Sequence, residues 1–172
     1  NYENAMAAIS VVKTYDVNNE SIYKVLSTFG GVEHRIEYVD TIDGVDYYND
    51  SKATNCESTK IALKSFNQPT LLILGGLDRG HSFDDLTPCM ENVTYVACYG
   101  ETKGRIKEYC DRIGKDCGVF DNLINATTAC YEKAQKGDVI LLSPACASWD
   151  QYKAFEDRGN EFKATVSSFK GE

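Results

Sequence analysis

Three short, continuously apolar runs constrain the fold of this chain more than any other feature. They span 71–74, 93–99 and 139–142, and stretches with helical spacing of apolar residues lie between them, for example 106–113. Strands that are apolar throughout are buried on both faces, which is typical of a parallel sheet covered by helices. The sequence therefore predicts an α/β, Rossmann-like fold with a mostly parallel sheet and helices on both faces.

The residues before these runs follow two other patterns. Apolar residues recur at helical spacing over residues 1–29, which predicts two amphipathic helices that end before Gly30-Gly31. From Arg35 to Tyr48 the period changes to two around Asp43-Gly44, which is typical of a β-hairpin with a type I′ turn. We therefore expect an antiparallel hairpin at one edge of the sheet, and a domain boundary that separates residues 1–31 from residues 32–172.

Charge and composition exclude several classes of function. The 172 residues include 18 Lys and Arg against 26 Asp and Glu, so the chain lacks the positive field that nucleic acids and anionic membranes require. No apolar run approaches the roughly 20 residues of a transmembrane helix, and the first residues do not resemble a signal peptide. We expect a soluble, cytoplasmic protein. Because the chain begins without methionine inside a helical pattern, we also expect it to be an excised fragment.

The cysteines and other ligand types do not predict a metal centre. The chain has seven cysteines, and no two of them form a C-x-x-C pair. This pattern fits neither a disulfide framework nor a zinc site, so we expect reduced and mostly buried thiols. We identify no set of metal ligands in the sequence.

Three polar loops follow predicted strands at their carboxyl ends, where ligands bind in sheets of this kind. They are N-D-S-K-A-T-N at 49–55, G-G-L-D-R-G at 75–80 and S-P-A-C-A-S at 143–148. In the first loop, Thr54 and Glu57 match a capping box, which predicts a helix N-cap at Thr54 and a helix to about Phe66. Lys52 beside a helix N-terminus suits an anion. The alternative is a simple cap with a solvated lysine.

The second loop resembles a phosphate-binding P-loop only superficially. His81 stands where G-x-x-x-x-G-K-[ST] requires lysine, and a mostly neutral imidazole cannot hold a triphosphate in the same way. The loop still presents Arg79, whose planar guanidinium suits a carboxylate or a phosphate. A surface arginine paired with Asp78 or Asp84 is the alternative.

The third loop carries a second candidate cap. Ser148 and Gln151 match a capping box, which predicts a helix that starts there. Gly159 lies inside that helix, so the helix either packs closely at this point or bends. Cys146 has no histidine near it in the sequence, and we interpret it as a small buried side chain rather than a nucleophile.

Five strings in the chain resemble the C-terminal part of the Mur ligase family, and the resemblance covers the whole chain in order. They are N-Y-E-N-A-M-A-A-I, G-V-E-H-R-I-E-Y-V, G-V-D-Y-Y-N-D-S-K-A-T-N, L-L-I-L-G-G-L-D-R-G and L-L-S-P-A-C-A-S-W-D-Q-Y-K-A-F-E-D-R-G-N-E-F. The first and third loops resemble those of the member that adds D-glutamate. The resemblance implies that residues 1–31 end a central ATPase domain and that residues 32–172 form the C-terminal domain.

The resemblance also implies an activity for the complete enzyme. Members of this kind use ATP to add D-glutamate to UDP-N-acetylmuramoyl-L-alanine through an acyl phosphate, as a step in peptidoglycan precursor synthesis in the bacterial cytoplasm. The C-terminal domain binds D-glutamate and closes over ATP. The P-loop and the magnesium ligands belong to the part of the family upstream of these residues. The fragment alone is therefore expected to be inactive.

Site residues follow from the same resemblance, position by position. Lys52 is expected to be catalytic. The residues expected to hold D-glutamate are Thr54, Arg79, Ser148, Trp149 and Phe155, and those expected to contact ATP are Asn4, Arg35 and Asp50. The chain departs from the family at two of these positions: Arg79 replaces a lysine that many members carry, and Trp149 is bulkier than the usual side chain.

Other classes remain open on the residues alone. A relative of folylpolyglutamate synthase would also present glutamate to an activated carboxylate, and a non-catalytic nucleotide-binding or interaction module could share the fold. An NAD-dependent oxidoreductase would fit the fold but not the loops, and fold alone does not decide function.

Overall fold

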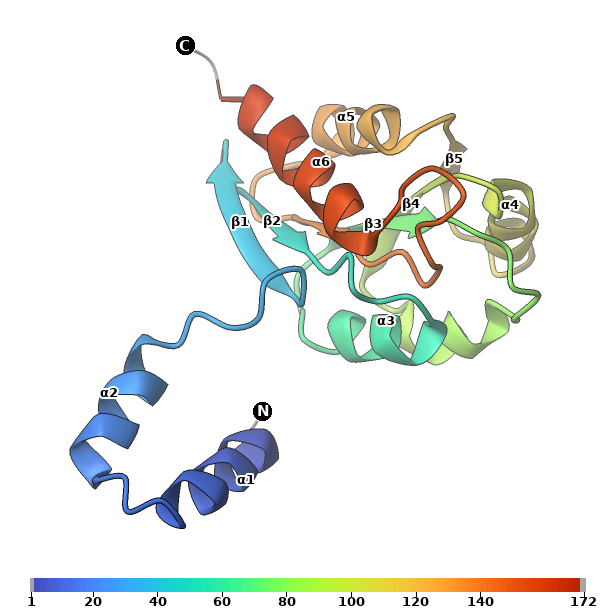
Figure 1. The fold of residues 1–172 in the computed structure, drawn as a ribbon. Helices are drawn as coiled ribbons and strands as arrows, with labels where there is room; N and C mark the ends of the chain where they lie inside the picture. The colour runs from blue at the N-terminus through green and yellow to red at the C-terminus, as the bar shows by residue number, and fades with distance from the viewer. Residues whose placement is uncertain (1, 171–172) are drawn as a thin grey trace. The chain divides into compact units, whose positions relative to one another are not determined.

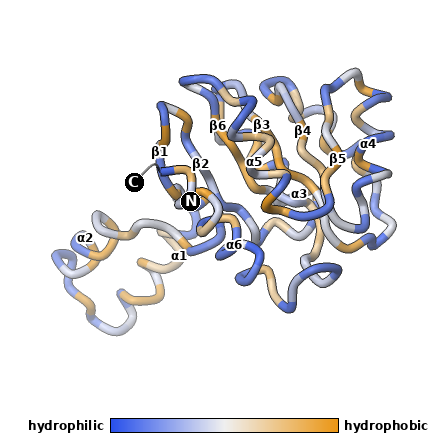
Figure 2. The backbone as a smooth tube through the Cα atoms, turned by 90° about the horizontal axis from the view of Figure 1, so that it is seen from above, coloured by the Kyte–Doolittle hydropathy of each residue, from blue (hydrophilic) through white to orange (hydrophobic). Residues whose placement is uncertain are grey.

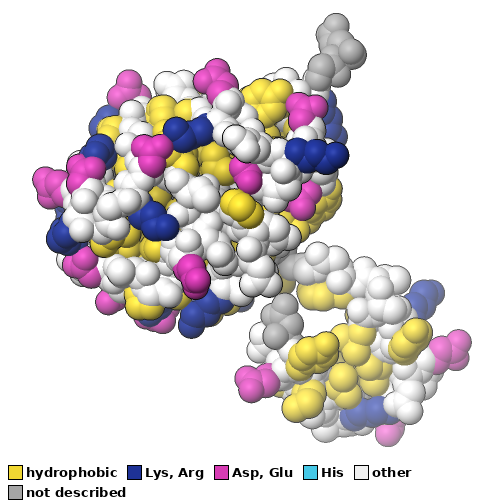
Figure 3. Space-filling model, turned by 180° about the vertical axis from the view of Figure 1, so that it is seen from behind, with side chains coloured by type: hydrophobic (Ala, Val, Ile, Leu, Met, Phe, Trp, Pro, Cys, Tyr) yellow, Lys and Arg dark blue, Asp and Glu magenta, His cyan; other side chains and the backbone are white. Residues whose placement is uncertain are grey.

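The computed structural model describes residues 2–170, and the chain divides between Val32 and Glu33 into two compact units. The first unit contains α1 (Tyr2–Lys13) and α2 (Asn19–Thr28), the two helices that the sequence predicts. Neither helix has a buried residue, and hydrophobic side chains gather on the surface of this unit (Figure 3). Met6, Val25 and Phe29 are each more than 60% exposed. The pair of helices therefore encloses no core of its own.

The second unit is built around one sheet with the strand order β1-β2-β6-β3-β4-β5. The strands are β1 (Glu37–Ile42), β2 (Val45–Asn49), β3 (Thr70–Gly75), β4 (Val93–Tyr99), β5 (Cys117–Val119) and β6 (Val139–Leu142). All neighbouring strands pair in parallel except β1 and β2, which form the antiparallel hairpin at one edge. Asp43 and Gly44 both have positive φ, 54° and 79°, as a type I′ turn requires. The predicted sheet and hairpin are thus confirmed.

Helices cover both faces of the sheet (Figure 1). One face carries α3 (Cys56–Leu63), the 3-10 helix η1 (Asp84–Cys89) and α4 (Lys103–Arg112), while the other carries α5 (Leu123–Lys133) and α6 (Phe155–Ser168). Side chains of β3 alternate between the two cores, with Leu72 and Leu74 in one and Leu71 and Ile73 in the other. This alternation between two buried faces explains why β3, β4 and β6 are mostly apolar, as Figure 2 shows.

The strand order brings the three polar loops to one edge of the sheet. β2, β6 and β3 are parallel neighbours, so their carboxyl ends, and the loops 49–55, 143–148 and 75–80 that follow, lie side by side. No helix among the described residues is long and apolar enough to cross a membrane.

Both predicted capping boxes are wrong. Helix α3 begins at Cys56, and its N-cap is Asn55, whose Oδ1 accepts a hydrogen bond from the Ser58 N–H at 2.9 Å. Thr54 belongs instead to the preceding turn, where its N–H donates to the Lys52 carbonyl at 3.0 Å. The helix also ends at Leu63, earlier than expected. Asparagine is as good an N-cap as threonine, so the pattern T-x-x-E could not separate two adjacent candidates.

The third loop is longer than predicted. Helix α6 begins at Phe155, seven residues after Ser148, and the Ala154 N–H donates to the Asp157 carboxylate at 3.2 Å. The Ser148 carbonyl accepts from the N–H groups of Gln151 and Tyr152, which closes a single turn rather than a helix. Ser148 and Gln151 therefore belong to this turn, and the apolar periodicity of the helix starts only at Phe155.

Candidate functional site

Asp50 is the first residue beyond β2 and lies at the centre of a buried polar cluster. Its N–H donates to the Leu142 carbonyl at 2.7 Å, which extends the pairing between β2 and β6 by one residue. Its carboxylate accepts from the Ile36 N–H at 3.2 Å and from the Ser143 hydroxyl at 2.7 Å. Burial raises the pKa of Asp50 to about 6, against the opposing effect of these hydrogen bonds and of the Arg35 charge. Near neutral pH the group is therefore mainly an ionised acceptor.

A small pocket of about 20 Å³ opens beside this carboxylate. Its lining residues come from the segment before β1, the 49–55 loop and α3: Arg35, Ile36, Asp50, Lys52, Ala53, Ser58 and Ile61. The structure thus brings Arg35, Asp50 and Lys52 to one place, while their ATP-binding and catalytic roles stay predictions.

The backbone on both sides of Arg35 is strained. His34 and Ile36 have φ of 63° and 46°, a left-handed conformation that costs a β-branched residue about 1–2 kcal/mol. In this conformation the Ile36 N–H reaches the Asp50 carboxylate. Strain of this kind is found where a chain must hold a functional geometry.

Lys52 lies next to the start of α6. Its ammonium group is 5.4 Å from the centroid of the Phe155 ring, and its backbone N–H donates to the His34 carbonyl at 3.0 Å. The neighbouring Ser51 hydroxyl donates to the Phe155 carbonyl at 2.8 Å. The backbone around Lys52 is thus fixed while its side chain stays exposed.

Arg158 ties the first and third loops together, and the sequence analysis did not identify it. The side chain is fully buried, at 0% exposure. Its Nε donates to the Ser51 hydroxyl at 2.9 Å, its Nη2 to the Ser51 carbonyl at 2.7 Å and its Nη1 to the Cys146 carbonyl at 3.0 Å. A signal was present in the sequence, because Arg158 lies three residues after Phe155 and four before Phe162, on the apolar side of the helix.

Gly159 lets α6 pack closely against the segment before β1. A β-carbon at this position would overlap His34 Nδ1 and come within 3.0 Å of Asn49 Nδ2. The helix is continuous from Phe155 to Ser168. Of the two alternatives for Gly159, close packing is therefore correct.

Glu33, His34 and Glu37 have ligand-type atoms within 4.8 Å of one another, but the group does not suit a hard cation. The Lys163 ammonium group bonds both carboxylates, and His34 Nδ1 lies 2.9 Å from Asn49 Nδ2. The two carboxylates thus already share one ammonium group. We interpret the group as an ion-pair network that attaches α6 to the start of this unit.

The Arg79 guanidinium lies over the Trp149 ring, so the second loop meets the third. The guanidinium carbon lies 4.8 Å from the centroid of the indole ring. Below this pair, the Leu77 N–H donates to the Ala147 carbonyl at 2.9 Å, and the two residues form an antiparallel bridge. The two loops are therefore joined through both backbone and side chains.

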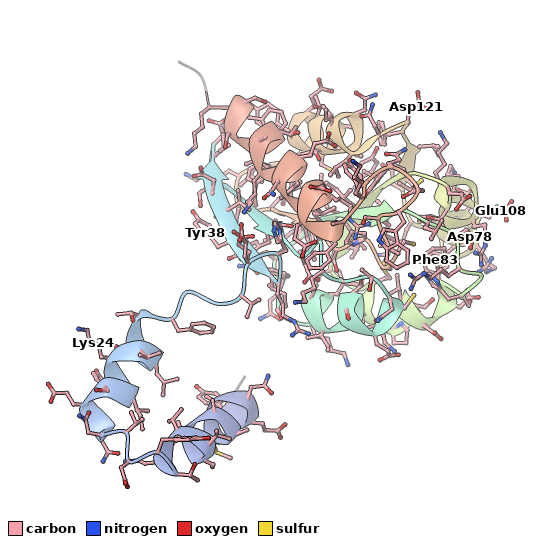
Figure 4. The ribbon with its side chains drawn as sticks, in the orientation of Figure 1. Lys24, Tyr38, Asp78, Phe83, Glu108 and Asp121 are labelled. Atoms are coloured by element: carbon pink, nitrogen blue, oxygen red, sulfur yellow. The ribbon has the colours of Figure 1, made fainter. Side chains whose placement is uncertain are left out.

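The suggested pairing of Arg79 with Asp78 or Asp84 is not found among the described residues. Asp78 forms an ion pair with Arg105, which also lies over the Phe83 ring, and Asp84 pairs with Arg112. Asp78 and Phe83 are labelled in Figure 4. The second loop is also followed by a 3-10 helix rather than the α-helix of a P-loop.

The remaining predicted residues lie in different surroundings. Ser148 is 2% exposed and directly precedes Trp149, while Thr54 is half-buried in the turn before Asn55. Asn4 is exposed on α1 and belongs to the other unit. Cys146 is fully buried, and burial raises the pKa of its thiol to about 11, which agrees with a packing role. The seven cysteines are all free.

The fold and the site together define a class of protein. It is an α/β domain in which the loops after the parallel strands carry basic side chains and a buried carboxylate at one edge of the sheet. The family described as "Mur ligase, glutamate ligase domain" matches residues 34–146. The chain belongs to the Mur ligase family, and its second unit contains the glutamate ligase domain.

Individual relatives agree with this assignment. The chain is 47% identical over 175 residues to the UDP-N-acetylmuramoylalanine--D-glutamate ligase of Bacillus subtilis (strain 168), an alignment that covers 99% of this chain and 38% of the relative. It therefore spans less than half the length of such relatives.

Solved structures share the fold at low sequence identity. The UDP-N-acetylmuramate-alanine ligase MurC from Thermotoga maritima aligns with a TM-score of 0.71 and 15% identity, over 97% of this chain and 37% of that one. E. coli FolC, solved in complex with ADP, aligns with a TM-score of 0.69 and 16% identity, over 98% of this chain and 40% of that one.

Proposed function

We propose that this chain is the C-terminal part of an ATP-dependent ligase that joins D-glutamate to UDP-N-acetylmuramoyl-L-alanine in the bacterial cytoplasm, as a step in peptidoglycan synthesis. The observation that carries the proposal is the 47% identity, along 99% of the chain, to a relative with that printed name. Residues 32–172 would be the domain that binds D-glutamate and closes over ATP.

The proposed reaction makes an amide bond in two steps. A carboxylate oxygen of UDP-N-acetylmuramoyl-L-alanine attacks the terminal phosphorus of ATP, giving an acyl phosphate and ADP. The amine of D-glutamate then attacks the acyl carbon, phosphate leaves, and the amine nitrogen loses a proton. The protein contributes mainly by placing the amine against the acyl carbon and by stabilising negative charge.

We assign D-glutamate to the edge where the three loops meet. Thr54, Ser148 and Arg79 would hold its two carboxylates, and Phe155 and Trp149 would flank them. Lys52 would supply a positive charge next to the reacting groups. Two features of the structure support this grouping: Arg158 links the first loop to the third, and the Arg79–Trp149 stack links the second to the third.

We assign the ribose of the nucleotide to the surface beside Asp50, where the pocket of about 20 Å³ has room for no more than a hydroxyl group. The ionised carboxylate would accept the ribose hydroxyls, because each of its oxygens holds only one donor and retains acceptor capacity. Arg35 would contact the ribose and phosphates. Asn4 belongs to the other unit, and its contact with adenine stays a prediction from the family resemblance. Magnesium would neutralise phosphate charge during the transfer. The described carboxylate group around Lys163 does not fit it, so we place its ligands outside residues 2–170.

We assign α1 and α2 to the end of the central ATPase domain. The support is their exposed apolar surface together with the length of the relatives, of which this chain spans 38%. Their apolar faces would pack against the preceding part of that domain.

The proposal is tested with the full-length enzyme that contains this chain. ADP release in the presence of UDP-N-acetylmuramoyl-L-alanine should require D-glutamate and should not respond to L-glutamate. Thr54→Ala and Ser148→Ala should each raise the KM for D-glutamate while the KM for ATP stays within about twofold. ADP release that depends on L-glutamate would instead favour a relative of folylpolyglutamate synthase, and its absence with every substrate would favour a binding module. The 172-residue chain alone should release no ADP.

A further inference from the structure

Trp149 is exposed, and the structure gives it one specific partner. The indole is 63% exposed although it directly follows a run of buried residues. The guanidinium carbon of Arg79 lies over this ring, 4.8 Å from its centroid. Cation–π pairs at exposed sites are modest in energy, but they restrict a long side chain to one orientation.

The surroundings leave the guanidinium available to a ligand. The two nearest acids in the sequence, Asp78 and Asp84, are engaged by Arg105 and Arg112. No ion pair of Arg79 is found within residues 2–170. A guanidinium that stacks through its face keeps its N–H groups free in the plane of the fork, where they can meet both oxygens of a carboxylate.

We propose that Trp149 is a positioning residue that holds the Arg79 guanidinium over its ring, so that the N–H groups of the guanidinium bind a carboxylate of the amino-acid substrate in bidentate fashion. The inference rests on the proposed function and adds to it a specific role for the indole. The backbone bridge between Leu77 and Ala147 lies two residues before Arg79 and Trp149, so it fixes the distance between the two loops from which these side chains extend. Recognition at this position is then a property of two side chains acting together.

The role predicts that the two residues are energetically coupled. Replacement of Arg79 by lysine would keep the positive charge but lose the planar guanidinium with its paired N–H donors. The effect of R79K on the KM for D-glutamate therefore depends on whether Trp149 holds that guanidinium in place. With Trp149 present, R79K should raise the KM for D-glutamate about fivefold. In the W149L background the same change should raise it about twofold or less, because the fork is no longer oriented.

The test is a double-mutant cycle in the full-length enzyme that contains this chain. The KM for D-glutamate, the KM for ATP and kcat are measured for the parent, R79K, W149L and the double variant. W149L alone should raise the KM for D-glutamate about two- to fivefold. W149F, which keeps an aromatic face, should stay within about twofold of the parent. The KM for ATP should not follow these changes.

Several results would overturn the proposal. Additive effects of R79K and W149L on the KM for D-glutamate would show that the residues act independently. An equal loss in W149F and W149L would show that the aromatic face is not used, and a parallel rise in the KM for ATP would indicate general damage to the domain. If the parent enzyme ligates D-glutamate but the effects are additive, only this inference fails. If the parent does not ligate D-glutamate at all, the proposed function fails as well.

A second measurement reports on the stack without any substrate. Trp149 is the one tryptophan in the 172 residues, so the fluorescence of this chain comes from the indole in question. R79L should change the emission intensity or maximum, whereas R112L, at an arginine paired with Asp84, should not. Identical spectra for the parent chain and R79L would contradict the stacked geometry and with it the proposal.

Discussion

Replacement of Arg158 should destabilise the second unit more than replacement of any exposed arginine. The guanidinium is fully buried and donates to the Ser51 hydroxyl and to the carbonyls of Ser51 and Cys146. Hydrogen bonds from a charged donor contribute about 1.5–3 kcal/mol each, and loss of the donor leaves buried acceptors without a partner. The three together correspond to a gross loss of roughly 5–9 kcal/mol.

The net loss is smaller because a buried charge is itself costly. Arg158→Leu removes the desolvation penalty of the guanidinium and restores some apolar contact, so we expect a net loss of about 3–5 kcal/mol. Arg158→Lys keeps a charge and a donor but cannot reach three acceptors in a fork, so we expect about 2–3 kcal/mol. Arg112→Leu is the matched control: that side chain is 57% exposed and pairs with Asp84 in solvent, so its replacement should leave the free energy of unfolding nearly unchanged.

The assay is urea unfolding of the 172-residue chain followed by far-ultraviolet circular dichroism, with all variants compared at one pH. The midpoint and slope give the free energy of unfolding for each variant. A free energy of unfolding for Arg158→Leu that is no lower than that of Arg112→Leu would refute the claim that Arg158 anchors the loops.

Three further predictions concern other parts of the second unit. Burial raises the Asp50 pKa from 3.8 to about 6, so the folded state binds this proton more tightly than the unfolded state does. The stabilisation that results is fully present below about pH 4 and is lost as the pH rises through 6. The unfolding free energy of the parent minus that of Asp50→Asn should therefore fall by about 2–3 kcal/mol between pH 4 and pH 7, and a constant difference in urea titrations would contradict the shift. Gly159→Ala should lose about 1–3 kcal/mol by overlap with His34, whereas Gly104→Ala, where a β-carbon meets nothing within 4 Å, should gain about 0.5–1 kcal/mol. A chain that starts at Glu33 should keep its thermal midpoint within a few degrees, since both cores consist of residues beyond it; a large drop in calorimetry would show that α1 and α2 support the fold.

The sheet could be predicted from the sequence because its signals are local and repeated. Apolar runs at β3, β4 and β6 leave few alternatives to buried parallel strands, and Asp43-Gly44 between alternating residues determines a hairpin. Each of these patterns is supported by several residues, so one misleading position does not change the result. The family resemblance rested likewise on several strings.

The helix starts at the site could not be placed in the same way. Thr54 and Asn55 are both good caps, and only the fold determines which side chain meets a free N–H group. The Ser148 turn and the start of α6 differ by seven residues because the third loop continues around Trp149 before the helix begins. The role of Arg158 depends on three acceptors that lie 12 and 107 residues away, which no local pattern contains.

Backbone strain gathers around the three loops, at the edge of the sheet where Lys52 and Arg79 lie. Three non-glycine residues near the site, His34, Ile36 and Ala145, have left-handed backbones. The Ile36 N–H, two residues after His34, donates to the Asp50 carboxylate, and the Cys146 carbonyl, next to Ala145, accepts from Arg158. Strain of this size persists only where neighbouring contacts determine the geometry, and here the Asp50 carboxylate and the Arg158 guanidinium provide those contacts. The backbone of the loops is therefore rigid before any ligand arrives, while Lys52 and Arg79 keep exposed charged ends, each lying against an aromatic ring. An edge of this kind can bind a small anion with little reorganisation, which is what catalysis by positioning requires.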